Sequence, residues 1–354
     1  MKWRAYTCAQ STHLFFMGIE MKQSRVFVSI FIWILFTMPG ANADHASRSF
    51  ETGATGAIMT VPGATLPEGD FVFGLGLQFI EMDEISDAEL ETLGAADEDV
   101  HSTGSLLNPS VNFAYGITAD LTVGASLPYV ERNDIRAAHS NAGVGEVEFA
   151  GDAAGVGDLT LFGQYRFFRN AGADLAVIAG IKIPTGDSNE REAKGELFET
   201  EHQPGTGSWD PFAGLAFNRN YGRAGISANV LYTFTTEGDQ QTELGDIFNY
   251  NLALSYRAYS PEGDHHHHHH ALNILDYVDL ALELNGDVRE RTEIDGEEEE
   301  HSGGHTLYVS PGIRVGLGHR WSVFTSFGLP IINDYHGRQS EPDYRVIAGL
   351  SVTF

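Results

Sequence analysis

The chain has 354 residues, with 49 acidic side chains, 21 basic side chains and a formal net charge of -28. A nucleic-acid-binding protein needs a basic surface, so this charge excludes that class of function. The single cysteine, Cys8, lies close to the amino terminus, so the rest of the chain has no disulfide framework, thiolate nucleophile or cysteine-based metal site.

Residues 1–43 are predicted to be an amino-terminal extension followed by a secretory signal peptide. A basic stretch begins at Met21 and is followed by an uncharged, mostly apolar run over residues 26–38. Small residues at Ala41 and Ala43 fit a cleavage site, so we expect translation to start at Met21 and cleavage to follow Ala43. The apolar run is too short for a membrane-spanning helix, which leaves an uncleaved anchor as the weaker alternative.

Beyond residue 69, apolar and polar side chains alternate in twelve segments, a pattern that predicts β-strands. Residues 44–68 precede them, are rich in Gly, Ala, Thr and Pro, and are expected to form a loosely structured periplasmic lead-in. The alternating rows fall within residues 71–79, 109–117, 121–129, 159–167, 175–183, 211–217, 224–234, 248–256, 278–284, 307–317, 321–329 and 344–354.

The stretch Gly155–Asp187 shows the alternation most clearly. Two arms that each alternate are joined by Arg169-Asn-Ala-Gly172, which predicts a β-hairpin with a tight turn. One face of the hairpin is aliphatic and aromatic, and the other carries charges among small residues, with Phe162 as the exception. The hairpin alone does not identify the solvent on either face.

The connections between the predicted strands differ in length. Residues 81–100 are strongly acidic, and Ser86 with Glu89 matches a capping box, so we expect a short surface helix there. Further long polar loops are expected at roughly 133–153 and 185–208. Other connections, such as residues 118–120, are tight turns.

Strand length and loop asymmetry together predict the fold. Segments of about ten residues cross a bilayer at a tilt, and barrels of the outer membrane have long external loops and short periplasmic turns. We therefore predict an all-β fold, a transmembrane antiparallel up-and-down β-barrel of about 12 strands over residues 69–354, in the outer membrane of a Gram-negative bacterium. A secreted soluble β-protein is the alternative, and it leaves the loop asymmetry unexplained.

Phe354 ends the chain on the apolar face of the last strand. This resembles the terminal strand that the outer-membrane assembly machinery recognises, so Phe354 is the candidate assembly signal. Gly155–Asp187, the run 203–211, Ser255-Tyr-Arg257 and Glu283-Leu-Asn-Gly286 resemble the transporter family described as the meta-pathway of phenol degradation (MetA-like). The resemblance implies an outer-membrane barrel that passes small, often hydrophobic compounds, and it names no solute.

Charged side chains on the polar face of the strands are candidates to line the lumen. In a barrel of this size side chains fill much of the interior, so these charges form either structural salt bridges, which we favour, or a polar constriction that selects solutes. The candidates are Asp158, Arg166, Asp174, Lys182, Arg257, Asp279, Glu283, Arg314 and Arg345.

A run of histidines lies between the eighth and ninth predicted strands and departs from the family pattern. It consists of His265, His266, His267, His268, His269 and His270. Counting strands places this connection in the periplasm, where neutral imidazoles would bind zinc, copper or nickel. A purification tag and a low-complexity linker are the alternatives. The remaining histidines are scattered among predicted loops and show no metal-ligand spacing, and no other cofactor is expected.

Catalysis is not expected, because no histidine falls on a predicted lipid-facing position and no Gly-x-Ser-x-Gly elbow is present. The sequence predicts a channel or transporter for passive uptake or export of small, hydrophobic or aromatic compounds. Its expected partners are membrane lipid, lipopolysaccharide, the assembly machinery and the solute, with divalent cations at the acidic loops as a weaker expectation. The alternatives are a metal-responsive barrel and a structural or surface-binding barrel without transport.

Overall fold

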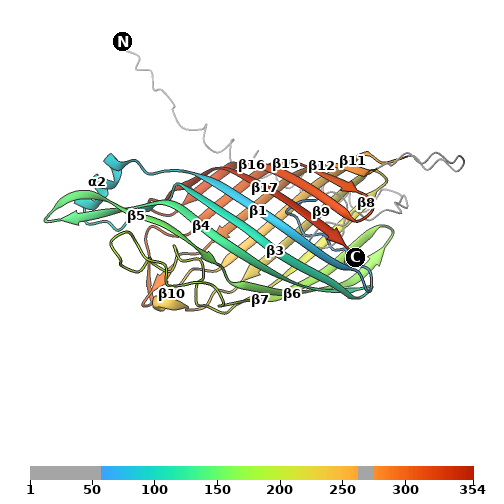
Figure 1. Ribbon diagram of the computed structural model, residues 1–354, viewed down its shortest axis with the longest axis horizontal. Coiled ribbons are helices and arrows are strands. Elements are labelled where there is room, and N and C mark those ends of the chain that lie inside the picture. Colours follow the sequence, from blue (N-terminus) through green and yellow to red (C-terminus); the bar gives the residue numbers. More distant parts are fainter. Residues whose placement is uncertain (1–56, 262–273) are drawn as a thin grey trace, which may run out of the picture. The chain divides into compact units, whose positions relative to one another are not determined.

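The computed structural model describes residues 57–261 and 274–354. The predicted signal peptide and the histidine run lie outside these residues and stay predictions. Within the described residues, 12 antiparallel strands form a closed barrel (Figure 1). The barrel strands are β1 (Phe71–Asp83), β3 (Ser105–Thr118), β4 (Leu121–Asn141), β6 (Leu159–Asn170), β7 (Ala173–Ile183), β8 (Asp210–Tyr221), β9 (Ala224–Thr233), β11 (Ile247–Tyr259), β12 (Leu275–Arg289), β15 (Gly304–Leu317), β16 (Trp321–Tyr335) and β17 (Glu341–Thr353).

Each barrel strand pairs with the barrel strands before and after it along the chain, and the first pairs with the last. The closing pair joins β1 to β17 in antiparallel register, with Phe73 opposite Val352 and Phe79 opposite Val346. Every predicted alternating segment overlaps one barrel strand, so the predicted fold class and strand order are confirmed. No helix within the described ranges is long and apolar enough to cross a bilayer.

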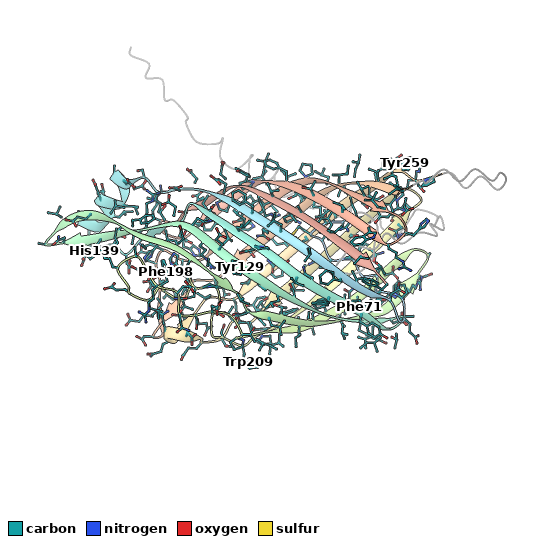
Figure 2. All side chains as sticks on the ribbon, viewed as in Figure 1. Phe71, Tyr129, His139, Phe198, Trp209 and Tyr259 are labelled. Atoms are coloured by element: carbon teal, nitrogen blue, oxygen red, sulfur yellow. The ribbon has the colours of Figure 1, made fainter. Side chains whose placement is uncertain are left out.

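The outer wall of the barrel is apolar. Leu215, Leu254 and Leu282 are each about half exposed, as lipid-facing side chains must be when no protein covers them. Aromatic residues lie toward both ends of the barrel: Figure 2 shows Phe71 near one end and Trp209 nearer the other. This distribution is typical of the aromatic girdles at the two membrane interfaces.

Short turns gather at one end of the barrel and long connections at the other. The turn between β6 and β7 consists of Ala171 and Gly172, which both have positive φ, as a tight hairpin of this twist requires. The connection between β11 and β12, which contains the histidine run, starts and ends at this short-turn end. Barrels of this class place the short turns in the periplasm, which agrees with the strand count.

Small elements form the layer of long connections. They are α2 (Asp87–Ala95), β2 (His101–Ser102), β5 (Val144–Val156), the 3-10 turn η1 (Asp239–Gln241), β10 (Thr242–Glu243), β13 (Glu293–Ile294) and β14 (Glu297–Glu298). Helix α2 confirms the predicted surface helix, although the carbonyl of Ser86, and not its side chain, accepts the hydrogen bonds of Glu89 and Leu90.

The prediction of a polar loop at 133–153 is wrong. Strand β4 continues to Asn141 and pairs with β5, so that a hairpin extends beyond the barrel (Figure 1). Apolar residues placed between the charges explain this difference. Ala138 and Val147 of the hairpin pack with Leu90 of α2, and Ile135 packs with Phe198 of the connection between β7 and β8. The hairpin therefore has its own small core above the membrane.

Residues 57–68, which we name the inner segment, also differ from the expected loose lead-in. Ala57 and Leu66 are fully buried, and backbone groups of the segment bond to side chains that alternate with lipid-facing residues and therefore point into the barrel. The main-chain N–H of Thr60, for example, donates to Glu283, whose neighbours Leu282 and Leu284 face outward. The inner segment is therefore an ordered part of the barrel interior.

Aromatic rings lie flat against glycines of neighbouring strands. A Cβ built at Gly286 would lie 2.1 Å from the ring of Tyr250, while one at Gly163 would meet nothing within 4 Å. Rings of Phe162 and Phe324 cover Gly124 and Gly349 in the same way. Phe162 and Phe324 do so on the inner face of the wall, and Tyr250 does so on the outer face beside Phe248, so these glycines make room for a large ring on either face.

We expect Gly286→Ala to lower the free energy of unfolding by about 1–3 kcal/mol, because the added methyl group overlaps the Tyr250 ring. Gly163→Ala is the matched control, since it adds the same methyl group to open space. Denaturant unfolding of both variants in detergent measures the difference. Equal destabilisation by the two substitutions would contradict this packing.

Candidate functional site

The predicted lumen charges all lie on the inner side of the barrel. All except Lys182 are at most 9% exposed, and the side chain of Lys182 is 22% exposed. Buried charges of this kind need partners, and the structure shows which partner each one has. Eight of the nine charges fall into three groups, which are ion pairs near the short turns, contacts with the inner segment, and a network near the long loops; Arg345 lies apart from them.

The first group consists of ion pairs near the short-turn end. Arg257 donates two hydrogen bonds to Asp279, at 2.6 and 2.9 Å. Arg166 donates to Asp120 at 2.8 and 3.0 Å, and its Nη1 lies 3.5 Å from Asp174. These ion pairs neutralise charge within the barrel wall, and we therefore interpret them as structural salt bridges.

The second group holds the inner segment, which sequence reasoning did not anticipate. The Glu283 carboxylate accepts hydrogen bonds from the main-chain N–H of Ile58, from that of Met59 at 3.0 Å and from that of Thr60 at 3.0 Å. Arg314 donates to the main-chain oxygen of Ala57 at 2.7 Å. Backbone groups, which carry no sequence signal, thus replace the side-chain partners that we expected.

The inner segment continues around the inner wall. Its Val61 N–H donates to Asn229 of β9 at 2.8 Å, and the carbonyls of residues 62 and 64 accept from Gln164 of β6. The Leu66 N–H then donates to Thr122 of β4 at 2.8 Å. The segment therefore hydrogen-bonds to strands β15, β12, β9, β6 and β4 and narrows the lumen.

The third group is a network centred on Asp158 near the long-loop end. Its carboxylate accepts from Lys182 at 2.9 Å, from the N–H of Gly186 at 2.9 Å and from the N–H of Thr206 at 3.0 Å. Lys182 also pairs with Asp210 at 2.8 Å. The hairpin 155–187 and the run 203–211, which carry the family resemblance, thus meet at one carboxylate.

Arg345, the remaining candidate, lies on β17. Its guanidinium donates to Asn285 at 3.0 Å and stacks on the ring of Tyr308, 4.0 Å from the ring centroid. Ser310 Oγ also donates to Asn285, so this arginine belongs to a polar layer on the inner wall. Such a layer rigidifies the wall and keeps the arginine hydrogen-bonded.

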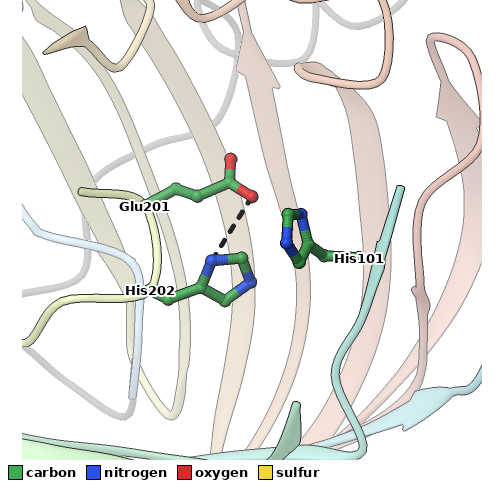
Figure 3. A group of neighbouring side chains, drawn as sticks. All are labelled: His101, Glu201 and His202. Atoms are coloured by element: carbon green, nitrogen blue, oxygen red, sulfur yellow. Dashed lines mark ion pairs between the residues drawn. The ribbon is translucent and has the colours of Figure 1, made fainter. Parts of the chain in front are cut away.

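A polar chamber of about 190 Å³ lies among the long connections. His101 of β2 and the pair Glu201 and His202, between β7 and β8, reach it from different parts of the chain (Figure 3). The rings of His101 and His202 have centroids 4.9 Å apart. Sequence reasoning had left both histidines as scattered loop residues, because a separation of this size along the chain gives no ligand spacing.

Burial changes the acid–base behaviour of the chamber. Burial raises the pKa of Glu199 to about 7. The charge of His101 lowers this pKa, and the negative charge of Glu201 raises it. Burial also holds the pKa of His202 well below its ordinary value. His202 is therefore a neutral imidazole at pH 7. In the part of the chain that the structure describes, two groups of side chains have a spacing that suits a metal ion, and His101 belongs to both. One group is His101, Glu201 and His202, and the other is Asp99, His101 and Glu199.

A family model described as "Putative MetA-pathway of phenol degradation" matches residues 46–263, more than half of the chain. The COG4313 outer membrane channel from Pseudomonas putida F1 has a similar structure, with a TM-score of 0.55 and 16% identity over 82% of this chain and 97% of that one. The Pseudomonas putida toluene transporter TodX aligns with a TM-score of 0.41 and 11% identity over 89% of this chain and 98% of that one. No curated protein matches by sequence. The likeness to the COG4313 channel shows the fold, which is that of a membrane β-barrel.

Proposed function

The chain belongs to the MetA-pathway phenol degradation family, and on that premise we propose that it is an outer-membrane channel through which small solutes diffuse along their gradient. The observation that carries the proposal is the closed barrel with an apolar exterior and a lumen lined by polar groups and aromatic rings. Such a barrel is stable in a bilayer and offers a solute a path through it.

The inner wall favours small aromatic solutes. Phe162, Phe212 and Tyr277 lie on the inner face of their strands and are partly buried. Aromatic faces attract other rings through offset or edge-to-face contacts. We assign the class of solute on this basis, and the acidic chamber at the mouth makes anions the least favoured members of that class.

Conductance in planar bilayers tests whether a path exists. We expect the purified barrel to add discrete, small current steps, because the inner segment occupies part of the lumen. A barrel that inserts and stays heat-modifiable in gels but adds no current would support a structural or surface-binding role instead.

Phe354 is proposed as the signal for the assembly machinery. Its backbone pairs with Phe71 across the closing seam, at 2.9 and 3.2 Å, while its side chain is 63% exposed on the lipid side. We expect Phe354→Ala, which keeps the backbone pairing, to lower the yield of assembled barrel several-fold in cells. Thr353→Val alters an inward side chain and is the control. Equal yields of heat-modifiable protein from the two variants would rule out this role for the ring.

A further inference from the structure

We propose that the chamber between the long connections binds one divalent transition-metal ion of the zinc class through His101, Glu201 and His202. The chamber shares no lining residue with the inner segment or with the Asp158 network. Metal binding there can therefore be tested independently of solute passage. It is also distinct from the histidine run, which lies outside the described residues.

The three side chains have the composition and spacing of a metal site. One donor atom from each lies within 4.8 Å of the others, and Nδ1 of His202 is 3.6 Å from Oε1 of Glu201 (Figure 3). Two imidazoles and one carboxylate form a common zinc ligand set, in which water takes the fourth position. Hard cations such as calcium prefer all-oxygen sites, so the histidine pair selects against them.

The backbone around the ligands is held in place. His101 pairs with Ala137 of β4, in the hairpin that extends above the barrel. The turn that carries Glu201 and His202 is fixed by Gln203, whose Nε2 donates to the carbonyl of Phe198 at 2.7 Å, and by Arg132, which donates to the carbonyl of Gln203 at 3.0 Å. Ligands on fixed backbones lose little conformational freedom when they bind an ion.

The charge of the chamber also favours a cation. Asp99, Glu199 and Glu299 line it, and Glu199 Oε2 lies 3.8 Å from Nδ1 of His101, where a carboxylate can orient the imidazole. The nearby Arg338 is engaged by Glu89 through two hydrogen bonds, at 2.6 and 2.9 Å. The chamber therefore keeps an excess of negative charge, which an ion would offset.

Binding would connect two long loops. His101 lies on the connection between β1 and β3, whereas Glu201 and His202 lie on the connection between β7 and β8. His301, the other histidine of the chamber, bonds to Glu98 at 2.8 Å and accepts from the Arg338 N–H, so it is already engaged. An ion held by the other two histidines would tie the loops together at the mouth of the barrel.

Calorimetric titration with Zn²⁺ tests the site in full-length barrel refolded with glutamine at positions 265–270, which removes the competing histidine run. We expect one Zn²⁺ per chain, and binding weakened about tenfold or more by His101→Ala, by His202→Ala and by Glu201→Gln. His139→Ala, on an exposed part of the β4–β5 hairpin, should bind like the parent.

Heat-modifiable migration confirms that each variant is folded, and Glu201→Gln serves as the test if the buried His202 variant is not. The proposal is overturned if the parent binds no Zn²⁺, if Ca²⁺ binds as tightly as Zn²⁺, or if folded ligand variants bind like His139→Ala.

Discussion

Replacing Glu283 by alanine is expected to release the inner segment and to raise the conductance of the barrel several-fold. The Glu283 carboxylate is 1% exposed and accepts hydrogen bonds from three consecutive main-chain N–H groups and from the hydroxyl of Thr60. A hydrogen bond to a charged group contributes about 1.5–3 kcal/mol, so the substitution removes much of what holds residues 58–60. A freed segment no longer narrows the lumen.

Thiol labelling reports the release directly. The only natural cysteine, Cys8, precedes the predicted cleavage site, so a cysteine at Ile58, which is 7% exposed, would be unique in the mature chain. In refolded protein this cysteine should react slowly with a polar thiol reagent, and many times faster when Glu283→Ala is added. Glu293→Ala, in the loop strand β13, is the control for loss of a carboxylate. Unchanged labelling and conductance in the Glu283 variant would mean that other contacts hold the segment.

Asp158→Asn is expected to destabilise the long-loop end by on the order of 3–5 kcal/mol, the usual cost of breaking a buried charge pair from one side. The substitution places an amide where Lys182 and the N–H groups of Thr185, Gly186 and Thr206 all donate to a carboxylate. Lys182 keeps Asp210 as a partner, but the amide nitrogen would face donors.

Denaturant unfolding and limited proteolysis of the connection between β7 and β8 measure this loss. Asp152→Asn is the matched control, because Asp152 is exposed and accepts a hydrogen bond from the N–H of Asp134 at 2.8 Å. It should change stability by no more than about 0.5 kcal/mol. If the two variants unfold alike and resist protease alike, the Asp158 network does not hold the loops.

The barrel strands were predictable because the bilayer acts on every one of them in the same way. Each strand must present apolar side chains to lipid at every second position, and this leaves a local signal in the sequence. The hairpin of β4 and β5 lies above the bilayer, so it needs no lipid-facing row, and Ala138, Phe149 and Ala153 show no regular alternation with polar residues there. Its core comes from α2 and Phe198, which are distant in sequence.

The sequence predicted that the candidate charged side chains point into the barrel, but it did not predict which groups they contact. Alternation places Glu283 and Arg314 inside the barrel, yet both bind main-chain groups of the inner segment, and no residue type marks a backbone partner. The chamber shows the same limit. His101 and His202 meet because two long loops fold over the mouth, and that contact depends on packing of the whole loop layer.

Flux from liposomes tests the central claim, passage of small aromatic solutes through the lumen, most directly. Phenyl glucoside and glucose share a sugar that keeps them from crossing lipid unaided, and they differ by one aromatic ring. Liposomes that contain the barrel should release phenyl glucoside at least as fast as glucose, because rings on the inner wall attract the phenyl group. Faster release of glucose would indicate a pore that selects by size alone, and release of neither solute above protein-free liposomes would contradict the channel.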